Sequence, residues 1–197
     1  MSKKLKPSDF VLLLLYVDNC SSIRGNTRFQ KLAFVFEKEI YKQMGFDKLN
    51  TEPNLFSFEA YKFGPFSKNL LKHIDFFVTF DVIERKNISY MDKDFYIDSS
   101  AMEYGDDDNE NASNYYEYFL TSKGKQYIED KLLPLLTKEQ LNILASIKQQ
   151  FNGIDLDTIL GYVYTKYKDM TINSEILEEV LNKTNGKEAE EFKYDRI

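Results

Sequence analysis

The stretch Tyr61-Lys-Phe-Gly-Pro-Phe-Ser-Lys-Asn-Leu-Leu-Lys-His-Ile74 governs the interpretation of the whole chain. Gly64 and Pro65 end an aromatic run, and proline is tolerated in the first turn of a helix. We therefore predict that a helix opens at Pro65 and runs to Val78. Apolar residues at helical spacing give it a packed side, formed by Leu70, Leu71, Ile74, Phe77 and Val78. The polar residues on its other faces are Lys68, Lys72 and His73.

The upstream segment Thr27-Arg-Phe-Gln-Lys-Leu-Ala-Phe-Val-Phe36 predicts another helix, capped by Thr27 and running to about Met44. Its apolar stripe at i, i+3, i+4 and i+7 spacing is Phe29, Leu32, Ala33, Phe36 and Ile40. The same spacing predicts that its cations point outward, namely Arg28, Lys31, Lys38 and Lys42. Ahead of this helix, residues 10–17 form a short apolar run between two aspartates, which we interpret as a buried helix and not as a secretory signal.

Downstream, β-forming residues after Asp81 and over residues 115–120 predict two strands. Between them lies an acidic segment, which we interpret as the tip of a wing and which carries Asp106, Asp107, Asp108 and Glu110. Helices are predicted from Ser122 to Leu133, over 138–151 and 155–167, and up to Leu181. The tyrosines of the third of these, Tyr162, Tyr164 and Tyr167, fit a half-buried core and an interface equally well.

This order of elements predicts an α+β fold, a winged helix-turn-helix with a two-stranded acidic-tipped wing and additional C-terminal helices. We divide the chain into a winged-helix domain (1–135), a helical extension packed on it (136–184) and a frayed charged tail (185–197). Within residues 55–63, alternating side chains predict a short strand or extended arm that leads into the Gly-Pro turn.

Composition narrows the class of protein. The chain has 197 residues with 15 % aromatic content, enough apolar surface for a packed core. Its single cysteine, Cys20, excludes an internal disulfide framework and favours a reducing, cytoplasmic setting. Apolar runs fall short of a membrane span. The net charge of −6 is uneven: residues 24–73 hold nine Lys/Arg against five Asp/Glu, whereas residues 74–197 hold fourteen against twenty-five.

Signals for catalysis are weak throughout the sequence. There is one histidine, His73, and there is no nucleophile elbow, Walker-type loop or dinucleotide-binding glycine pattern. The carboxylates of residues 106–108 lack the spacing, the glycine and the terminal glutamate of an EF-hand. We therefore predict a protein that is not an enzyme, with no cofactor and no metal site.

Three segments in a fixed order carry a family resemblance: Thr27-Arg-Phe-Gln-Lys-Leu32, Tyr61-Lys-Phe-Gly-Pro-Phe-Ser67 and Tyr118-Phe-Leu-Thr-Ser-Lys-Gly124. With them the chain resembles the YwgA-like winged-helix proteins and, more distantly, the Panacea or SocA-type antitoxin domain. The resemblance spans roughly residues 8–135, with Phe29 and Phe66 where Leu and Tyr are expected. It implies a non-enzymatic role, as a transcription regulator or as an antitoxin that neutralises a partner.

We expect a regulatory or neutralising interaction protein of the antitoxin or phage-defence type that binds a protein partner, such as a toxin, an effector or a complex subunit. The alternatives are a DNA-binding transcription regulator that uses the 65–78 helix and a small structural subunit of a larger complex. The sequence is also compatible with a homodimer. The acidic tip favours a basic partner protein, because DNA phosphates would repel it. The expected contact residues are Arg24, Arg28, Lys31, Lys62, Lys68, Asn69, Lys72 and His73. The expected architectural residues are Gln30, Lys31, Tyr61, Gly64, Pro65, Phe66 and Ser67.

Overall fold

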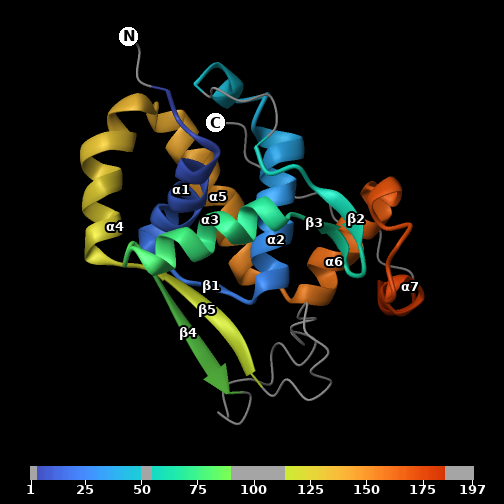
Figure 1. Ribbon diagram of the computed structural model, residues 1–197. Helices are drawn as coiled ribbons and strands as arrows, with labels where there is room; N and C mark the ends of the chain where they lie inside the picture. The colour runs from blue at the N-terminus through green and yellow to red at the C-terminus, as the bar shows by residue number, and fades with distance from the viewer. Residues whose placement is uncertain (1–3, 50–54, 90–113, 185–197) are drawn as a thin grey trace.

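The centre of the molecule is helix α1 (Pro7–Cys20), which is surrounded by the other helices of an α+β fold (Figure 1). The computed structural model describes residues 4–49, 55–89 and 114–184. Residues 10–15 of α1 are fully buried, which confirms the predicted buried helix. Helix α5 (Lys138–Gly153) packs along α1, and α3 (Lys68–Thr79) crosses it on the face turned to the viewer. Within the described ranges, no helix has the length and apolar character needed to cross a bilayer.

A three-stranded antiparallel sheet lies at one end of these helices, in the order β1 (Ile23–Arg24), β5 (Asn114–Leu120) and β4 (Ile83–Ser89). Tyr118 in the central strand pairs with Ile23 on one side and with Arg85 on the other. The pairing of β4 with β5 confirms the two predicted strands. The predicted acidic tip, with Asp106, Asp107, Asp108 and Glu110, and the tail 185–197 lie outside the described residues.

Helix α2 (Asn26–Val35) continues through a π-helical turn, η1 (Phe36–Ile40), and a short 3₁₀ turn follows at η2 (Phe46–Lys48). The predicted apolar stripe is buried, and so is nearly every other side chain of α2, because α2 contacts α5, α6 and β3. The prediction that Arg28 and Lys31 point outward was therefore wrong, since both are buried. Lys38 and Lys42, beyond the end of α2, are exposed as predicted.

The predicted extended arm is a small hairpin of β2 (Glu59–Tyr61) and β3 (Gly64–Phe66). Gly64 has φ +81°, and a Cβ at this position would lie 2.8 Å from a ring carbon of Tyr164, so the turn requires glycine here. Pro65 belongs to β3 and does not open the helix as we predicted. Helix α3 begins at Lys68, where the Ser67 side chain accepts a hydrogen bond from the Leu70 amide at 3.0 Å.

The C-terminal half is helical. Helix α4 (Ser122–Tyr127) continues through η4 (Ile128–Leu132) and ends in a 3₁₀ turn, η5 (Leu133–Leu135), at Pro134. After α5 come α6 (Leu156–Lys166), η6 (Lys168–Met170) and α7 (Leu177–Thr184). Tyr162 and Tyr164 are buried and Tyr167 is half-buried. The hydroxyls of Tyr162 and Tyr167 donate to Glu39 at 2.7 Å, so these tyrosines are part of the core.

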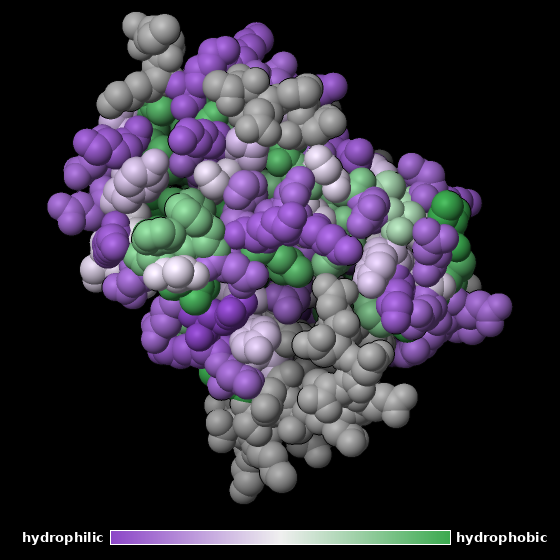
Figure 2. Space-filling view, viewed as in Figure 1, coloured by the Kyte–Doolittle hydropathy of each residue, from purple (hydrophilic) through white to green (hydrophobic). Residues whose placement is uncertain are grey.

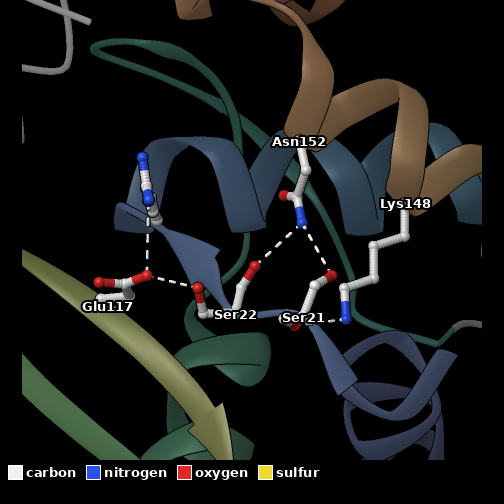
Figure 3. Close-up of polar contacts among 6 residues, drawn as sticks. Ser21, Ser22, Glu117, Lys148 and Asn152 are labelled. Carbon is white, nitrogen blue, oxygen red and sulfur yellow. Dashed lines mark hydrogen bonds and ion pairs between the residues drawn. The ribbon is translucent and has the colours of Figure 1, made fainter. Parts of the chain in front are cut away.

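The connection from α1 to β1 has unusual backbone. Asp18, Asn19 and Cys20 all have φ between 54° and 56°, in the left-handed region that costs L-residues energy. The buried side chain of Lys148, from α5, reaches into this turn (Figure 3). Its Nζ donates to the carbonyls of Leu15 and Val17 at 2.9 Å and to that of Ser21 at 2.6 Å. Burial lowers the pKa of Lys148 to about 8.

One turn further along α5, Asn152 extends the same contact. Its Nδ2 donates to the Ser22 carbonyl at 2.9 Å and to the Ser21 hydroxyl at 3.3 Å (Figure 3). The Ser22 hydroxyl donates in turn to Glu117 of β5. The cluster therefore joins α5, the end of α1 and the central strand of the sheet.

Removing the Lys148 ammonium should destabilise the fold. Lys148→Met keeps the apolar stem but leaves the carbonyls at the end of α1 without a donor, and we expect a loss of about 1–3 kcal/mol in the free energy of unfolding. Urea denaturation followed by circular dichroism measures this loss. Lys138→Met, at an exposed position of the same helix, is the control and should change stability little. Equal stability of the two variants would contradict the role given to Lys148.

Candidate interaction surface

Helix α3 has one packed side and one exposed side. The packed side contains Leu70, Ile74 and Phe77, which are buried as predicted. The exposed residues are Lys68, Asn69, Lys72, Asp75, Phe76 and Thr79. His73 is half-buried between the two sides. The exposed face is therefore basic and polar over its first turns and apolar near its end.

Two phenylalanines stand out at the end of α3. Phe76 is 55 % exposed and Phe80, the residue that follows α3, is 53 % exposed. Their ring centroids lie 4.6 Å apart, so they form one apolar patch. In the space-filling view, apolar side chains gather over the end of α3 that leads into β4, among hydrophilic neighbours (Figure 2). Contiguous aromatic surface of this kind usually marks an interaction site.

The end of α3 is anchored to the neighbouring elements by polar contacts. The Asp75 carboxylate lies 2.7 Å from the Arg85 guanidinium on β4. Lys123 donates from Nζ to the Phe80 carbonyl at 2.8 Å. Thr121 donates to the Asp81 carbonyl at 2.9 Å and accepts from the Gly124 amide at 3.1 Å. These contacts give the third resemblance segment an architectural role, and they place cations beside the phenylalanine patch.

The start of α3 is fixed by α2. Lys31 donates from Nζ to the carbonyls of Phe63 at 2.5 Å and Pro65 at 3.0 Å. Gln30 pairs with both backbone groups of Ser67: its amide donates to the carbonyl at 3.1 Å, and its oxygen accepts from the N–H at 2.9 Å. Burial lowers the pKa of Lys31 to about 7. The first two resemblance segments are therefore in direct contact through Gln30 and Lys31.

The remaining architectural residues also belong to this hairpin. The rings of Tyr61 and Phe66 stack across it with centroids 5.0 Å apart. The Ser67 hydroxyl donates to the Phe56 carbonyl, and the Phe56 amide donates to Glu37 at 2.9 Å. The hairpin is therefore anchored at both of its ends before α3 begins.

The expected contact residues do not form one surface. Arg28 is buried and donates to the carbonyls of Phe151 and Ile154, the latter at 2.7 Å, so like Lys31 it is unavailable to a partner. Arg24, on β1, lies 3.4 Å from Glu117. Lys62, in the turn between β2 and β3, lies 3.5 Å from Glu175. Only the residues of α3 are brought together: Lys68, Asn69, Lys72 and His73.

The sequence analysis missed the apolar half of this surface, Phe76 and Phe80. A signal was present, because residues 68, 72, 76 and 80 are spaced by four and therefore lie along one side of a helix. The analysis also missed Arg85 and Lys123, which no local pattern marks. Their positions depend on how β4 and α4 approach the end of α3.

Among the described residues, no group of three His, Cys, Asp or Glu side chains is placed to hold a metal ion. Comparisons of the chain with family models, with curated proteins and with solved structures give no match. The surface of α3 must therefore be interpreted from its own geometry.

The buried ammonium of Lys31 should make stability depend on pH. Its pKa is lower in the folded chain than the ordinary 10.5, so above about pH 7 the unfolded chain binds more protons. Stability should therefore rise as the pH increases from about 7 toward 10, by up to about 1.4 kcal/mol per pH unit from this group. Urea denaturation at pH 7, 8 and 9 measures the slope. Lys31→Met should reduce the slope and Lys42→Met, at an exposed position, should not; equal slopes would show that Lys31 does not titrate in this range.

Lys68 occupies the first position of α3, where the helix dipole is positive and no acidic residue compensates it. Lys68→Glu should therefore stabilise the protein, by about 0.3–1 kcal/mol at low ionic strength. Thermal and urea denaturation of this variant beside Lys68→Gln separate the loss of the cation from the gain of the carboxylate. A destabilised Lys68→Glu variant would show that Lys68 supports the fold.

Proposed function

We propose that the chain is a winged-helix protein that acts by binding and not by catalysis. The order α1, β1, α2, α3, β4, β5, with the β2–β3 hairpin inserted between α2 and α3 and with β1 and β4 on either side of β5, supports this fold. In such an arrangement α3 takes the place of the recognition helix and the β4–β5 hairpin takes the place of the wing. The resemblance to YwgA-like and Panacea or SocA-type proteins rests on three segments. The first two are joined by hydrogen bonds from Gln30 and Lys31 to the backbone of residues 63–67.

The partner in this proposal is a protein, bound through the exposed face of α3. The observation that carries it is the pair Phe76 and Phe80, each more than half exposed and in contact with the other at the C-terminal end of that face. Aromatic side chains are enriched at the cores of protein interfaces, where they supply most of the binding energy. A helix that only contacted phosphates and base edges would gain little from them.

DNA binding is the second candidate, and the first turns of α3 favour it. Lys68, Asn69 and Lys72 are exposed together, a combination that contacts phosphates and adenine edges. Against it, Arg28 and Lys31 are buried, and Asp75 lies on the same exposed face. The cationic surface is therefore smaller than the sequence implied, and the protein partner is favoured.

One experiment separates the two candidates. The tagged full chain is purified from its native host without nuclease, as wild type, Phe76→Ser/Phe80→Ser, Lys68→Glu/Lys72→Glu, and Ile172→Ser as a control. Ile172 is 73 % exposed on the segment before α7, so its loss tests for non-specific apolar contacts. Quantitative mass spectrometry and nucleic-acid sequencing then measure what co-purifies.

We expect a stoichiometric protein partner with the wild type and the Ile172→Ser control, reduced at least tenfold with Phe76→Ser/Phe80→Ser. A partner retained by this double variant would contradict the proposed surface. Specific DNA that is lost with Lys68→Glu/Lys72→Glu, in the absence of a protein partner, would establish the second candidate in its place.

A further inference from the structure

Four exposed side chains form a line along α3, which we call the α3 stripe: Lys68, Lys72, Phe76 and Phe80. They are spaced by four residues, and with a rise of 1.5 Å per residue the stripe is roughly 18 Å long. Its first half carries two ammonium groups and its second half carries the two phenyl rings, which are tilted against each other. The stripe is therefore cationic in its first half and apolar in its second half.

The charges of the stripe are not balanced by its neighbours. Neither Lys68 nor Lys72 forms an ion pair with any of the described residues. The nearby carboxylate, Asp75, is paired with Arg85 at 2.7 Å. Lys123 adds a further cation at the end of the stripe, where it donates to the Phe80 carbonyl. Lys72 and Lys123 therefore lie beside the phenylalanine patch, together with the paired Asp75 and the exposed Asp81.

The geometry points to an occupant of defined chemistry: we propose that the α3 stripe binds an amphipathic helix of a partner protein. That helix carries carboxylates at one end, over Lys68 and Lys72, and apolar side chains at the other, over Phe76 and Phe80. Rows of residues spaced by four are the ridges that pack into the grooves of a second helix. A segment of three to four turns covers the stripe, in the helix-in-groove mode of recognition. This inference rests on the proposed function and specifies its partner.

A second copy of this chain fits the stripe less well. In an antiparallel pairing the lysines of one copy would lie over the phenylalanines of the other, and in a parallel pairing the lysines would face one another. The stripe itself contains no carboxylate for Lys68 or Lys72 of a second copy, and Asp75, on the same exposed face, is already paired with Arg85. Charge complementarity therefore favours a partner that brings its own acidic residues.

The test uses two synthetic helical peptides of about 16 residues, long enough to cover the stripe. Both have three leucines on one half of a single face; the acidic peptide has three glutamates on the other half, and the control peptide has three lysines there. Each is titrated into the ¹⁵N-labelled full chain, and amide shifts in NMR spectra report the site and the affinity. Sedimentation velocity of the free chain measures self-association.

We expect the acidic peptide to bind about tenfold more tightly than the lysine peptide at low salt, and to shift the signals of residues 68–80 and Lys123. Lys68→Glu/Lys72→Glu should reverse this preference, and Phe76→Ser/Phe80→Ser should abolish binding of both peptides. Circular dichroism checks that each exposed-site variant remains folded. The reversal is the decisive result, because a merely destabilised variant would lose binding without changing partner.

Equal binding of the two peptides, shifts that miss residues 68–80, or Phe-dependent self-association of the free chain would each overturn the inference. Purification of the variants from the host tests the proposed function independently of the peptide experiment. If the host protein partner still depends on Phe76 and Phe80 but is indifferent to Lys68→Glu/Lys72→Glu, the partner surface stands and the acidic-helix occupant is wrong. If neither double variant affects the partner, both proposals fail.

Discussion

The placement of α3 depends on two adjacent side chains of α2 that bind the backbone of the β3 segment. Lys31 donates to two carbonyls and Gln30 pairs with both backbone groups of Ser67, all in the interior. A shift of the hairpin would leave these buried polar groups without partners, at a cost of about 1–3 kcal/mol for each group. Because Ser67 also caps α3, the same contacts determine where the helix starts and which residues it exposes.

Two other buried cations also donate hydrogen bonds to backbone carbonyls in the interior. Lys148 donates to carbonyls around the left-handed turn at the end of α1, and Arg28 donates to the carbonyls of Phe151 and Ile154 at the end of α5. At chain reversals the backbone carbonyls lack helix or strand partners, and long side chains with several donors can reach them. In each of the three cases the cation joins segments far apart in the sequence. A cationic count along the chain therefore overstates how basic the surface is.

Sequence reasoning succeeded where local patterns determine structure. The buried run of α1 followed from its contiguous apolar residues, and the apolar stripe from Phe29 to Ile40 and the packed side of α3 followed from periodicity. The starts of α4, α5 and α6 followed from their capping residues, whereas α2 begins at Asn26, ahead of the predicted Thr27 cap. The Ser67 cap was missed in favour of Pro65, because the pairing of β3 with β2 is a tertiary contact that extends the Gly-Pro segment past the proline. The acidic tip, on which the choice of partner first rested, lies outside the described residues and so contributes nothing to the structural argument.

The polar residues of the α3 surface were predicted from the sequence, but its two phenylalanines were not, and two buried cations were wrongly assigned to the surface. These errors have physical causes. Lys68, Asn69 and Lys72 are exposed as expected, because they occupy polar positions on an amphipathic helix. Arg28 and Lys31 are buried because their apolar stems pack in the interior while their charged ends bind carbonyls, which periodicity cannot anticipate. Phe76 and Phe80 were missed because a search for a core assigns aromatic residues to the inside, although their spacing from Lys68 and Lys72 aligns them with the polar side of the helix.

The choice of residues on α3 differs from that on α5 and α6 in a way that stability does not explain. Helix α5 begins with a reciprocal Thr137–Gln140 capping box and has Glu139 in its first turn, and α6 begins with the Asp155 cap followed by Asp157. Helix α3 has a cap but places Lys68 at the positive end of its dipole and exposes two phenylalanines near its other end. Both features oppose the general rules for a stable, soluble helix surface. Departures from local consistency concentrate where a protein functions, and here both departures fall on one face of one helix. That coincidence, more than either feature alone, is the reason to regard the outer face of α3 as a surface shaped by a binding partner.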